Sequence, residues 1–504
     1  MGLIKQNQAV IWIQTNGPGT QLGVFAADSK NAAMSGKSIP VATISPTYER
    51  NRLGRATPLN VSRSAPGDLP GATITIYEQN SLTFLDTLVK SQCPINIQLR
   101  YVDCGVLDNP NIWDKVQIWS EGSLTTNNPG DGPSLGFNDE SMTSAGSFSF
   151  RRVLIIVRTG LSNFNPPAAG VLNILAIDGI SDEDCNECGV GYPGADKVLV
   201  AGMEAGVAAT AKVIATSTGG SSLGNVAADP FIADEDVSSV QVYQIDSDTY
   251  RVIVGTNTTA AGNKAHIAYA DFNWGDELNP IGAAWTPTIV TSSVNADIVE
   301  AIGWFSYARV YIAASGDIYV SETQGEFADD AAIYTGATTI NGFATTPDGT
   351  FVFAFGNTNL ILRERDGNGT FEGRVGPTGG GAFHSLAISE NGTIFAGNGQ
   401  SIYKSTDNAG NANNWTELKD FGANNRVVGI DTVSGDSEVL RVVVDDTTPG
   451  TGQVWESLDG GASFRQITAL ANTGYNDAYF SETNDNLAVI VGDGNIVQFL
   501  SPTN

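Results

Sequence analysis

The stretch SLDGGASF at residues 457–464 holds Ser457, Asp459, Gly461 and Phe464 in the order Ser-x-Asp-x-Gly-x-Ser-aromatic, directly after a strand-like run. An aspartate at this point accepts hydrogen bonds from backbone amides two or three residues ahead, and adjacent glycines take positive φ without steric cost. The pattern therefore predicts a tight turn between two strands. A single copy would indicate only an ordinary hairpin.

Aromatic residues that follow loops rich in Gly, Asp and Asn recur along the second part of the chain. They are Trp285, Phe327, Phe371, Trp415 and Phe464. Their successive separations are 42, 44, 44 and 49 residues. A period of about 40–50 residues with several short strands in each period is typical of the blades of a β-propeller.

The loops before these aromatic residues keep parts of the same pattern. One copy holds Ser405, Asp407 and Trp415, and another holds Asp366 and Phe371. Paired apolar runs joined by an Asn-Gly turn precede the loops, as in HSLAISENGTIFAGNG at 384–399. About four strands for each unit are therefore predicted, and residues 457–464 are interpreted as one copy of a repeat.

The loop resembles the Asp-box, or BNR repeat, of sialidases, sortilin-like receptors and other β-propellers. Only residues 457–464 match that pattern in full, and the other copies are degenerate. In this family the boxes lie at the periphery of the blades. The resemblance implies a propeller fold with a structural role for the box residues, and it implies no particular activity.

The number of predicted strands sets the expected number of blades. Five boxed units end near residue 470, and residues 476–502 supply three further strands. A missing fourth strand would leave a sheet edge exposed. The expected donors are the runs at 197–202 or 211–217, which gives six blades closed by the N-terminal and C-terminal strands of this domain; a seventh blade drawn from 196–236 is the alternative.

A chain of 504 residues is long enough for two or more domains. The segment around 181–195 is rich in Asp, Glu, Gly and Pro and has no period, so it is interpreted as a connector between a domain at 1–180 and a propeller at 196–504. Long apolar stretches are absent, and the first residues lack the regions of a signal peptide. Synthesis in a cytoplasm without membrane insertion is expected.

Negative charge is concentrated in the second part of the chain. Residues 1–190 hold 13 Lys+Arg and 17 Asp+Glu, a net charge of −4, whereas residues 191–504 hold 13 and 37, a net charge of −24. A surface of this sign repels nucleic acid and anionic membranes. Plain solubility, or a salty habitat, accounts for the same charge.

No metal or other cofactor is predicted. The cysteines are Cys93, Cys104, Cys185 and Cys188, and the histidines are His266 and His384. A structural zinc site needs four ligands, and both histidines lie far along the chain in predicted propeller strands. The cysteines are interpreted as ordinary thiols, although the sequence leaves the oxidation of either pair open.

The first region reads as a β-domain. Strands are predicted at 9–14, 22–27, 72–79, 95–104, 115–122, 147–158 and 171–177. A helix is predicted between the third and fourth of these, at 81–92, because Leu82, Leu85, Leu88 and Val89 fall on one helical face and Ser81 is a suitable N-cap. Residues 1–180 are therefore expected to form a β-sandwich or barrel with one short helix.

The segment 35–71 has five prolines and little that could form a core. Loops of this length in compact domains are functional or disordered. It carries Arg50, Arg52, Arg55 and Arg63. These arginines suit either a nucleic-acid patch or an arm that meets carboxylates on a neighbouring subunit, and the arm is favoured because only Tyr48 is at hand for base stacking.

The order of strands, long loop and the strand–helix–strand block at 72–104 resembles the tail tube (major tail) protein of long-tailed bacteriophages, over about residues 1–175. The resemblance implies stacked rings, usually hexameric, in which sheets join across subunits to line a channel for DNA. It also implies that the long loop contacts the next ring, that the partners are further copies and other tail proteins, and that the protein resides in the virion tail after assembly in the host cytoplasm. A propeller in place of the usual immunoglobulin-like extra domain leaves a baseplate or injection-tube component as a variant of this interpretation.

Three functions are therefore weighed. The first is a structural virion protein with the propeller displayed outside the tube, and the second is a propeller that binds a host-surface glycan or protein. The third is a sialidase-like glycoside hydrolase, which needs an arginine cluster and a Tyr nucleophile with a Glu partner.

The arginines of the propeller are Arg251, Arg309, Arg363, Arg365, Arg374, Arg426, Arg441 and Arg465, none in the Arg-Ile-Pro setting of that family. No catalytic residue is predicted, and the Gly-rich run at 376–383 is interpreted as a turn because it lacks the Lys-Ser/Thr of a phosphate loop.

Overall fold

The computed structural model describes the chain as two compact units, residues 1–158 (with residue 504) and residues 159–503. The residues described are 9–15, 21–26, 32–38, 48–50, 56–58, 69–76, 95–101, 115–128, 144–157, 159–163, 173–180, 198–203, 213–216, 224–225, 235–244, 249–258, 265–273, 286–289, 299–306, 309–323, 325, 332–346, 349–365, 369–407, 409–410, 414–433, 439–446, 451–471, 474–480, 488–494 and 496–502. Over these ranges the secondary structure is almost entirely β, and no helix there is long and apolar enough to cross a membrane.

The first unit contains one eight-stranded antiparallel sheet. Its strands are β1 (Ala9–Thr15), β2 (Gln21–Ala26), β3 (Ala32–Ser38), β6 (Gly71–Ile76), β7 (Ile95–Tyr101), β8 (Lys115–Asn128), β9 (Ser144–Ser149) and β10 (Arg152–Val157). The order is β2-β1-β7-β8-β9-β6-β3, and β10 pairs with β8. The predicted helix at 81–92 lies outside the described residues.

The sheet of the first unit bends where β8 passes from one set of partners to another. The first half of β8 pairs with β7 and β10, and its second half pairs with β9. Gly122 lies at the change, where a Cβ atom would stand 2.4 Å from the ring of Phe150. A strand that bends in this way lets one sheet fold over its own face. Ile11 and Ile97 from one half accordingly share a buried core with Ile74 from the other.

The predicted arm at 35–71 contains a short hairpin. Strands β4 (Tyr48–Arg50) and β5 (Ala56–Pro58) pair with each other, and the flanking strands β3 and β6 also pair, up to Ser38 and Gly71. The arm therefore leaves and re-enters the sheet between two neighbouring strands. Arg50 ends β4, whereas Arg52, Arg55 and Arg63 lie outside the described residues.

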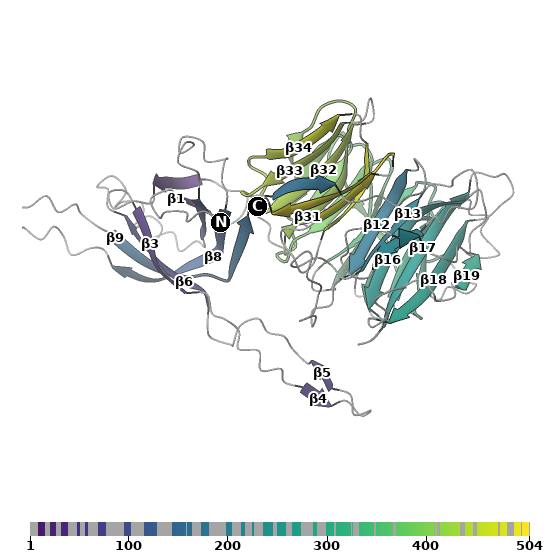
Figure 1. The fold of residues 1–504 in the computed structure, drawn as a ribbon, viewed down its shortest axis with the longest axis horizontal. Coiled ribbons are helices and arrows are strands. Elements are labelled where there is room, and N and C mark those ends of the chain that lie inside the picture. Colours follow the sequence, from purple (N-terminus) through teal and green to yellow (C-terminus); the bar gives the residue numbers. More distant parts are fainter. Residues whose placement is uncertain are drawn as a thin grey trace, which may run out of the picture. The chain divides into compact units, whose positions relative to one another are not determined.

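The second unit consists of seven small antiparallel sheets (Figure 1). Their first strands are β12 (Ile174–Ile180), β16 (Glu235–Gln244), β20 (Val299–Ser306), β23 (Ile340–Thr345), β27 (Phe383–Ile388), β31 (Asn425–Thr432) and β35 (Tyr475–Phe480). The second strands are β13 (Val198–Met203), β17 (Thr249–Thr258), β21 (Arg309–Ala314), β24 (Phe351–Gly356), β28 (Ile394–Asn398), β32 (Leu440–Asp446) and β36 (Ala488–Gly492). The third strands are β14 (Val213–Thr216), β18 (His266–Asn273), β22 (Asp317–Ser321), β25 (Leu360–Arg365), β29 (Ser401–Ser405), β33 (Thr451–Ser457) and β37 (Ile496–Pro502).

Outer strands complete most of these sheets. They are β15 (Gly224–Asn225), β19 (Thr286–Ile289), β26 (Glu372–Val375), β30 (Trp415–Asp420), β34 (Arg465–Ala471) and, in the last sheet, β11 (Thr159–Asn163). In the third sheet the described residues give only a bridge between Ile318 and Tyr334 at this position. The second strands read as nearly continuous apolar runs, because each sheet packs against a neighbour on both faces.

The last sheet is closed by a strand from far earlier in the chain. β11 pairs with β37, from Thr159 opposite Pro502 to Asn163 opposite Gln498. A donated strand was predicted, but the donor was wrong, since the runs at 197–202 and 211–217 form β13 and β14 of the first sheet. The seven sheets differ from the six that were favoured and agree in number with the alternative, whose seventh blade was placed at 196–236; the sheet there also includes β12 at 174–180.

The boundary between the units differs from the predicted connector at 181–195. It falls between residues 158 and 159, because β11 and β12 pair with strands of the second unit. The composition of 181–195 resembled a linker, but the strand before it already belongs to the first sheet.

Glycines in the second strands let neighbouring sheets approach closely. A Cβ atom on Gly255 would lie 2.4 Å from Val299, and one on Gly397 would lie 2.7 Å from Val427. In both pairs the valine belongs to the first strand of the next sheet. Such distances exclude any side chain larger than hydrogen unless the sheets separate.

Candidate functional site

A hydrogen bond joins each sheet of the second unit to the next. Seven side chains from first or second strands make these bonds: Asp178 to Val242 N, Ser238 to Val299 O, Glu300 to Ile340 N, Asn341 to Phe383 O, Ser385 to Val427 O, Asp445 to Tyr475 N and Asp477 to Ile177 N. The last of them joins the seventh sheet to the first. The sheets therefore form a closed ring in chain order, which is the arrangement of a β-propeller.

The first strands of the seven sheets enclose a central cavity of about 440 Å³. All seven contribute to its wall, and Phe355 is added from β24. A cavity of this size is within the range of small-molecule sites. We take this central channel as the candidate functional site.

Each first strand carries a bulge at the same place. The residues left without a register partner are Leu175, Ser238, Glu300, Asn341, His384, Val428 and Asn476, and all of them line the channel. Two residues further along each strand, on the same face, lie Ile177, Val240, Ile302, Phe343, Leu386, Ile430 and Ala478, which also line it. The channel therefore has a mainly polar layer, named here the bulge layer, beside an apolar layer.

The sequence contains a signal for this site that the aromatic period did not use. From the residue before each bulge, the first strands read ILAI, VSSV, VEAI, INGF, FHSL, VVGI and YNDA. The common pattern is apolar, any residue, small residue, apolar. The seventh copy has Asp477 in place of the small residue, and second strands also contain the pattern, as in VFAF at 352–355, so it indicates these strands without counting them.

Burial makes two carboxylates of the channel, Asp477 and Glu300, harder to ionise. Asp477 accepts hydrogen bonds from Ile177 N at 3.0 Å and Ala478 N at 2.8 Å, and burial raises its pKa to about 6. Burial also raises the pKa of Glu300. The hydrogen bonds that its carboxylate accepts from Ile340 N and Gly316 N have the opposite effect on this pKa. Loss of solvation outweighs these hydrogen bonds at both groups.

One guanidinium lines the channel. Arg426 donates from Nη2 to Asp445 Oδ2 at 3.1 Å, and its Nε atom makes no hydrogen bond to the described residues. The neighbouring His384 has its pKa lowered to about 4 by burial and by the charge of Arg426. The imidazole is therefore neutral near pH 7, and Arg426 is the cation of this part of the channel.

The loop at 457–464 closes on itself through its serine and aspartate. Ser457 Oγ accepts from Gly461 N at 2.9 Å, and the buried Asp459 accepts from Ser463 N at 2.8 Å and from Ser463 Oγ at 2.5 Å. Gly461 has φ 91°, and a Cβ atom there would meet Leu418 at 2.4 Å. The turn therefore needs glycine both for its backbone angle and for its packing.

Two other loops share part of this geometry. In the loop after β29, Ser405 Oγ accepts from Ala409 N at 3.3 Å, and Asp407 accepts from Gly410 N at 3.2 Å and Asn414 Nδ2 at 2.6 Å. After β22, Ser321 Oγ accepts from Gly325 N at 3.0 Å. In three sheets, therefore, a serine at the end of the third strand accepts a hydrogen bond from a backbone amide of the loop that follows.

The aromatic residues after these loops pack beneath them. Trp415 donates from Nε1 to Val375 O at 2.7 Å, Phe371 packs edge-on against Tyr311, and Phe464 packs edge-on against Phe421. Asp366, Trp285 and Phe327 lie outside the described residues. The described members therefore join the loop to the sheet core and none of them lines the central channel.

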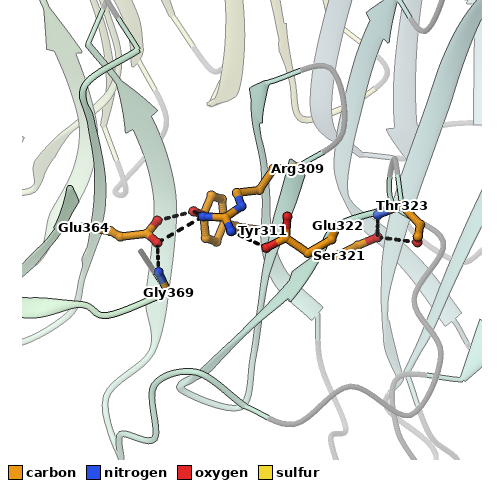
Figure 2. Close-up of polar contacts among 7 residues, drawn as sticks. All are labelled: Arg309, Tyr311, Ser321, Glu322, Thr323, Glu364 and Gly369. Carbon is orange, nitrogen blue, oxygen red and sulfur yellow. Dashed lines mark hydrogen bonds and ion pairs between the residues drawn. The ribbon is translucent and has the colours of Figure 1, made fainter. Parts of the chain in front are cut away.

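A glutamate replaces the loop serine in the fourth sheet, as Figure 2 shows. Glu364 in β25 accepts from Gly369 N, from Tyr311 Oη and from Arg309 Nη1, the last at 3.4 Å. Arg309 also pairs with the exposed Glu322. Tyr311 and Arg309 come from β21 of the third sheet, so the cluster ties two sheets together.

This cluster contains a Tyr–Glu pair and an arginine, residue types that a sialidase-like site requires, although no sequence pattern placed them together. Tyr311 and Glu364 are both fully buried. Burial, together with Glu364, raises the pKa of Tyr311 above its ordinary value, which disfavours the phenolate that a nucleophile needs. These buried residues connect the third and fourth sheets through hydrogen bonds.

The remaining arginines do not gather around one point. The eight arginines singled out from the sequence belong to four different sheets. Arg251 pairs with Asp271 at 2.5 Å, Arg374 with Glu372 at 3.2 Å and Arg465 with Glu456 at 2.9 Å. The first and third pairs join neighbouring strands of one sheet, and Arg374 and Glu372 lie in the same strand, β26.

The four cysteines lie outside the described residues. His266 is in β18, where its backbone amide donates to Thr256 Oγ1, and His384 lies in the bulge layer. Within the part of the chain that the structure describes, no group of three or more His, Cys, Asp or Glu side chains is placed to hold a metal ion.

The fold of the second unit defines a β-propeller. No family model matches the chain, and no curated protein matches its sequence. Among solved structures, it is similar to YCF48 bound to D1 peptide (13% identity, TM-score 0.47, 69% of this chain and 98% of that chain) and to YCF48 from Cyanidioschyzon merolae (12%, 0.47, 68% and 99%). A chain of the mitotic checkpoint complex is similar to the same degree (12%, 0.47, 68% and 91%).

Proposed function

We propose that this chain is a structural virion protein, the subunit of a bacteriophage tail tube, in which the first unit polymerises and a seven-bladed propeller is carried outside the tube. The observation that carries the proposal is the hairpin arm between β3 and β6. A compact domain gains nothing within its own core from such an excursion. The arm therefore suits contact with another subunit.

The edges of the first unit's sheet support ring formation. Strands β2 and β3 end the path of described pairings. A sheet edge offers unpaired backbone N–H and C=O groups, which pair readily with another chain. Sheets joined through such edges in a ring, taken as hexameric from the tail tube resemblance, would line a channel through which DNA passes transiently.

The arm accounts for stacking of the rings in this proposal. Its arginines, Arg50, Arg52, Arg55 and Arg63, would meet carboxylates of the adjacent ring as bidentate ion pairs. The partners are thus further copies of the chain and other tail proteins, after assembly in the host cytoplasm. The virion tail is the resulting location, and no membrane or cofactor takes part.

Electron microscopy of the purified full chain tests this proposal. Wild-type protein is expected to form rings and stacked tubes, and stacking is expected to weaken as salt screens the ion pairs. Replacing Arg50, Arg52 and Arg55 together by serine should leave rings but impair stacking, whereas the control Arg151→Ser, an exposed arginine outside the arm, should stack normally. Normal tubes from the triple variant at every salt concentration would show that the arm does not join the rings.

The central channel favours host-surface binding by the propeller as a second candidate function. Its mixed polar and apolar wall suits recognition of a glycan or protein group. We propose no enzymatic activity, because Tyr311 and Glu364, which a sialidase-like mechanism would use, are fully buried. Binding of the full chain to host cells, and its loss on removal of surface glycans, would favour this second function.

A further inference from the structure

The channel of the propeller has the properties of a built small-molecule site. Its wall consists of seven first strands that hydrogen bonds join into a closed ring, so the cavity exists without any ligand. A preformed wall lowers the cost of ordering on binding. The question is which chemistry the wall matches.

Opposite charges lie on different sides of the channel wall, with Glu300 in the bulge layer and Arg426 two residues before the bulge residue Val428 of its strand. Glu300 extends from β20 and Arg426 from β31, and the strands β23 and β27 come between them in the ring. Both bonds that the structure gives Glu300 use Oε2, which leaves Oε1 available. The Arg426 side chain is 37% exposed, and Asp445 takes only its Nη2 atom, so the outer part of the guanidinium faces the channel.

Neutral donors and acceptors lie between these two charges. Asn341 and His384 occupy the bulge positions of the intervening strands, and His384 is uncharged near neutral pH. Beneath them the apolar layer presents Ile302, Phe343 and Leu386 on the same side of the channel. This side thus offers an anion, a cation and an apolar surface around one space.

A ligand with a single charge would match this wall poorly. A lone anion would meet Arg426 but also the carboxylates Asp178, Glu300 and Asp477, which exceed it in number. A lone cation would meet Glu300 and desolvate the partly exposed guanidinium of Arg426 without giving it a new partner, which costs free energy. Only a ligand with both charges satisfies both groups.

We infer that the channel binds a small zwitterion with an apolar side chain, of the size of a free branched α-amino acid. Its ammonium group lies at Glu300, its carboxylate at Arg426, and its side chain on the apolar layer of Ile302, Phe343 and Leu386. Binding is non-covalent and leaves the ligand unchanged. The inference concerns the propeller alone and does not depend on tube formation.

Calorimetric titration of the full wild-type chain with three matched compounds tests the inference without any variant. L-Leucine carries both charges, 4-methylpentanoate carries only the carboxylate, and 3-methylbutylamine carries only the ammonium. Leucine is expected to bind at least about tenfold more tightly than either of the others, since each loses one charge-assisted contact. Absence of leucine binding, or equal binding of a singly charged compound, would overturn the inference.

Two matched variants locate the site. Arg426→Gln should weaken leucine binding about tenfold or more and leave the weak binding of 3-methylbutylamine unchanged. Arg374→Gln is the control, because Arg374 pairs with Glu372 on the outer strand β26, away from the channel. If both variants, or neither, lose leucine binding while remaining folded, the ligand does not lie at Arg426. Failure of the chain to form tubes would leave this result untouched, so the two proposals fail separately.

Discussion

Gly397→Ala tests the close packing that joins the propeller sheets. A Cβ atom at this position would lie 2.6 Å from Ser385 Oγ and 2.7 Å from Cβ and Cγ1 of Val427. Ordinary contacts of this kind begin near about 3.4 Å, so the fifth and sixth sheets must separate by several tenths of an ångström. Overpacking of this kind costs about 1–3 kcal/mol.

The separation also affects a hydrogen bond. Ser385 Oγ donates to Val427 O at 3.0 Å across the same junction, and weakening this bond adds about 1 kcal/mol. Gly397→Ala should therefore lower the free energy of unfolding of the full chain by about 2–4 kcal/mol. Urea titration followed by tryptophan fluorescence measures the loss.

Two further variants separate packing from the intrinsic effect of alanine. Gly373→Ala is the control, because nothing lies within 4 Å of a Cβ atom there, and it should be neutral or slightly stabilising. Combining Gly397→Ala with Val427→Ala should cost less than the sum of the two single changes, since the second change removes Cγ1 of Val427, one of the atoms that clash. Equal stability of Gly397→Ala and Gly373→Ala, or strict additivity in the double variant, would refute the packing argument.

The remaining predictions concern buried polar groups. Because the pKa of Asp477 is raised from 3.8 to about 6, its contribution to stability is complete below about pH 4 and is lost as the pH rises through 6. Asp477→Asn should thus stabilise the propeller by up to about 3 kcal/mol at pH 7.5 and have little effect at pH 4, as thermal unfolding across this range will show; a constant difference at all pH values would contradict it. Tyr311→Phe removes a hydrogen-bond donor from the buried carboxylate of Glu364 and should lower the free energy of unfolding by about 1–3 kcal/mol. Adding Glu364→Gln to this variant should recover part of the lost stability. Asp459→Ala should cost a similar amount through the unsatisfied amide of Ser463 and leave leucine binding intact; lost binding with unchanged melting would show that the loop is not structural.

The sequence predicted the propeller fold because one feature of each unit is local. The turn at 457–464 and the aromatic residue after it follow the third strand directly, so their spacing reports the repeat without any long-range information. The closing strand was assigned wrongly for the opposite reason. Thr159 pairs with Pro502, and no local pattern distinguishes β11 from a strand of the first unit.

The candidate site was less accessible to sequence analysis. Its polar groups occupy bulge positions that differ in identity from sheet to sheet, from Ser238 to Glu300 to His384, so no residue type repeats. A small residue follows the bulge in six of the seven first strands, and Asp477 takes this position in the seventh, so the site is marked only indirectly. Glu364 illustrates the same difficulty. It occupies the position of the loop serine and accepts the same kind of backbone hydrogen bond, but the sequence pattern does not identify it because the side chain differs.

The central claim is that the first unit assembles into a tube that carries the propeller outside. Negative-stain electron microscopy of the purified full chain, at increasing protein concentration and low salt, tests it most directly. The proposed function predicts hollow rings that stack into tubes with added density around the outside. A chain that stays monomeric at every concentration, with the propeller folded as its thermal unfolding shows, would contradict it.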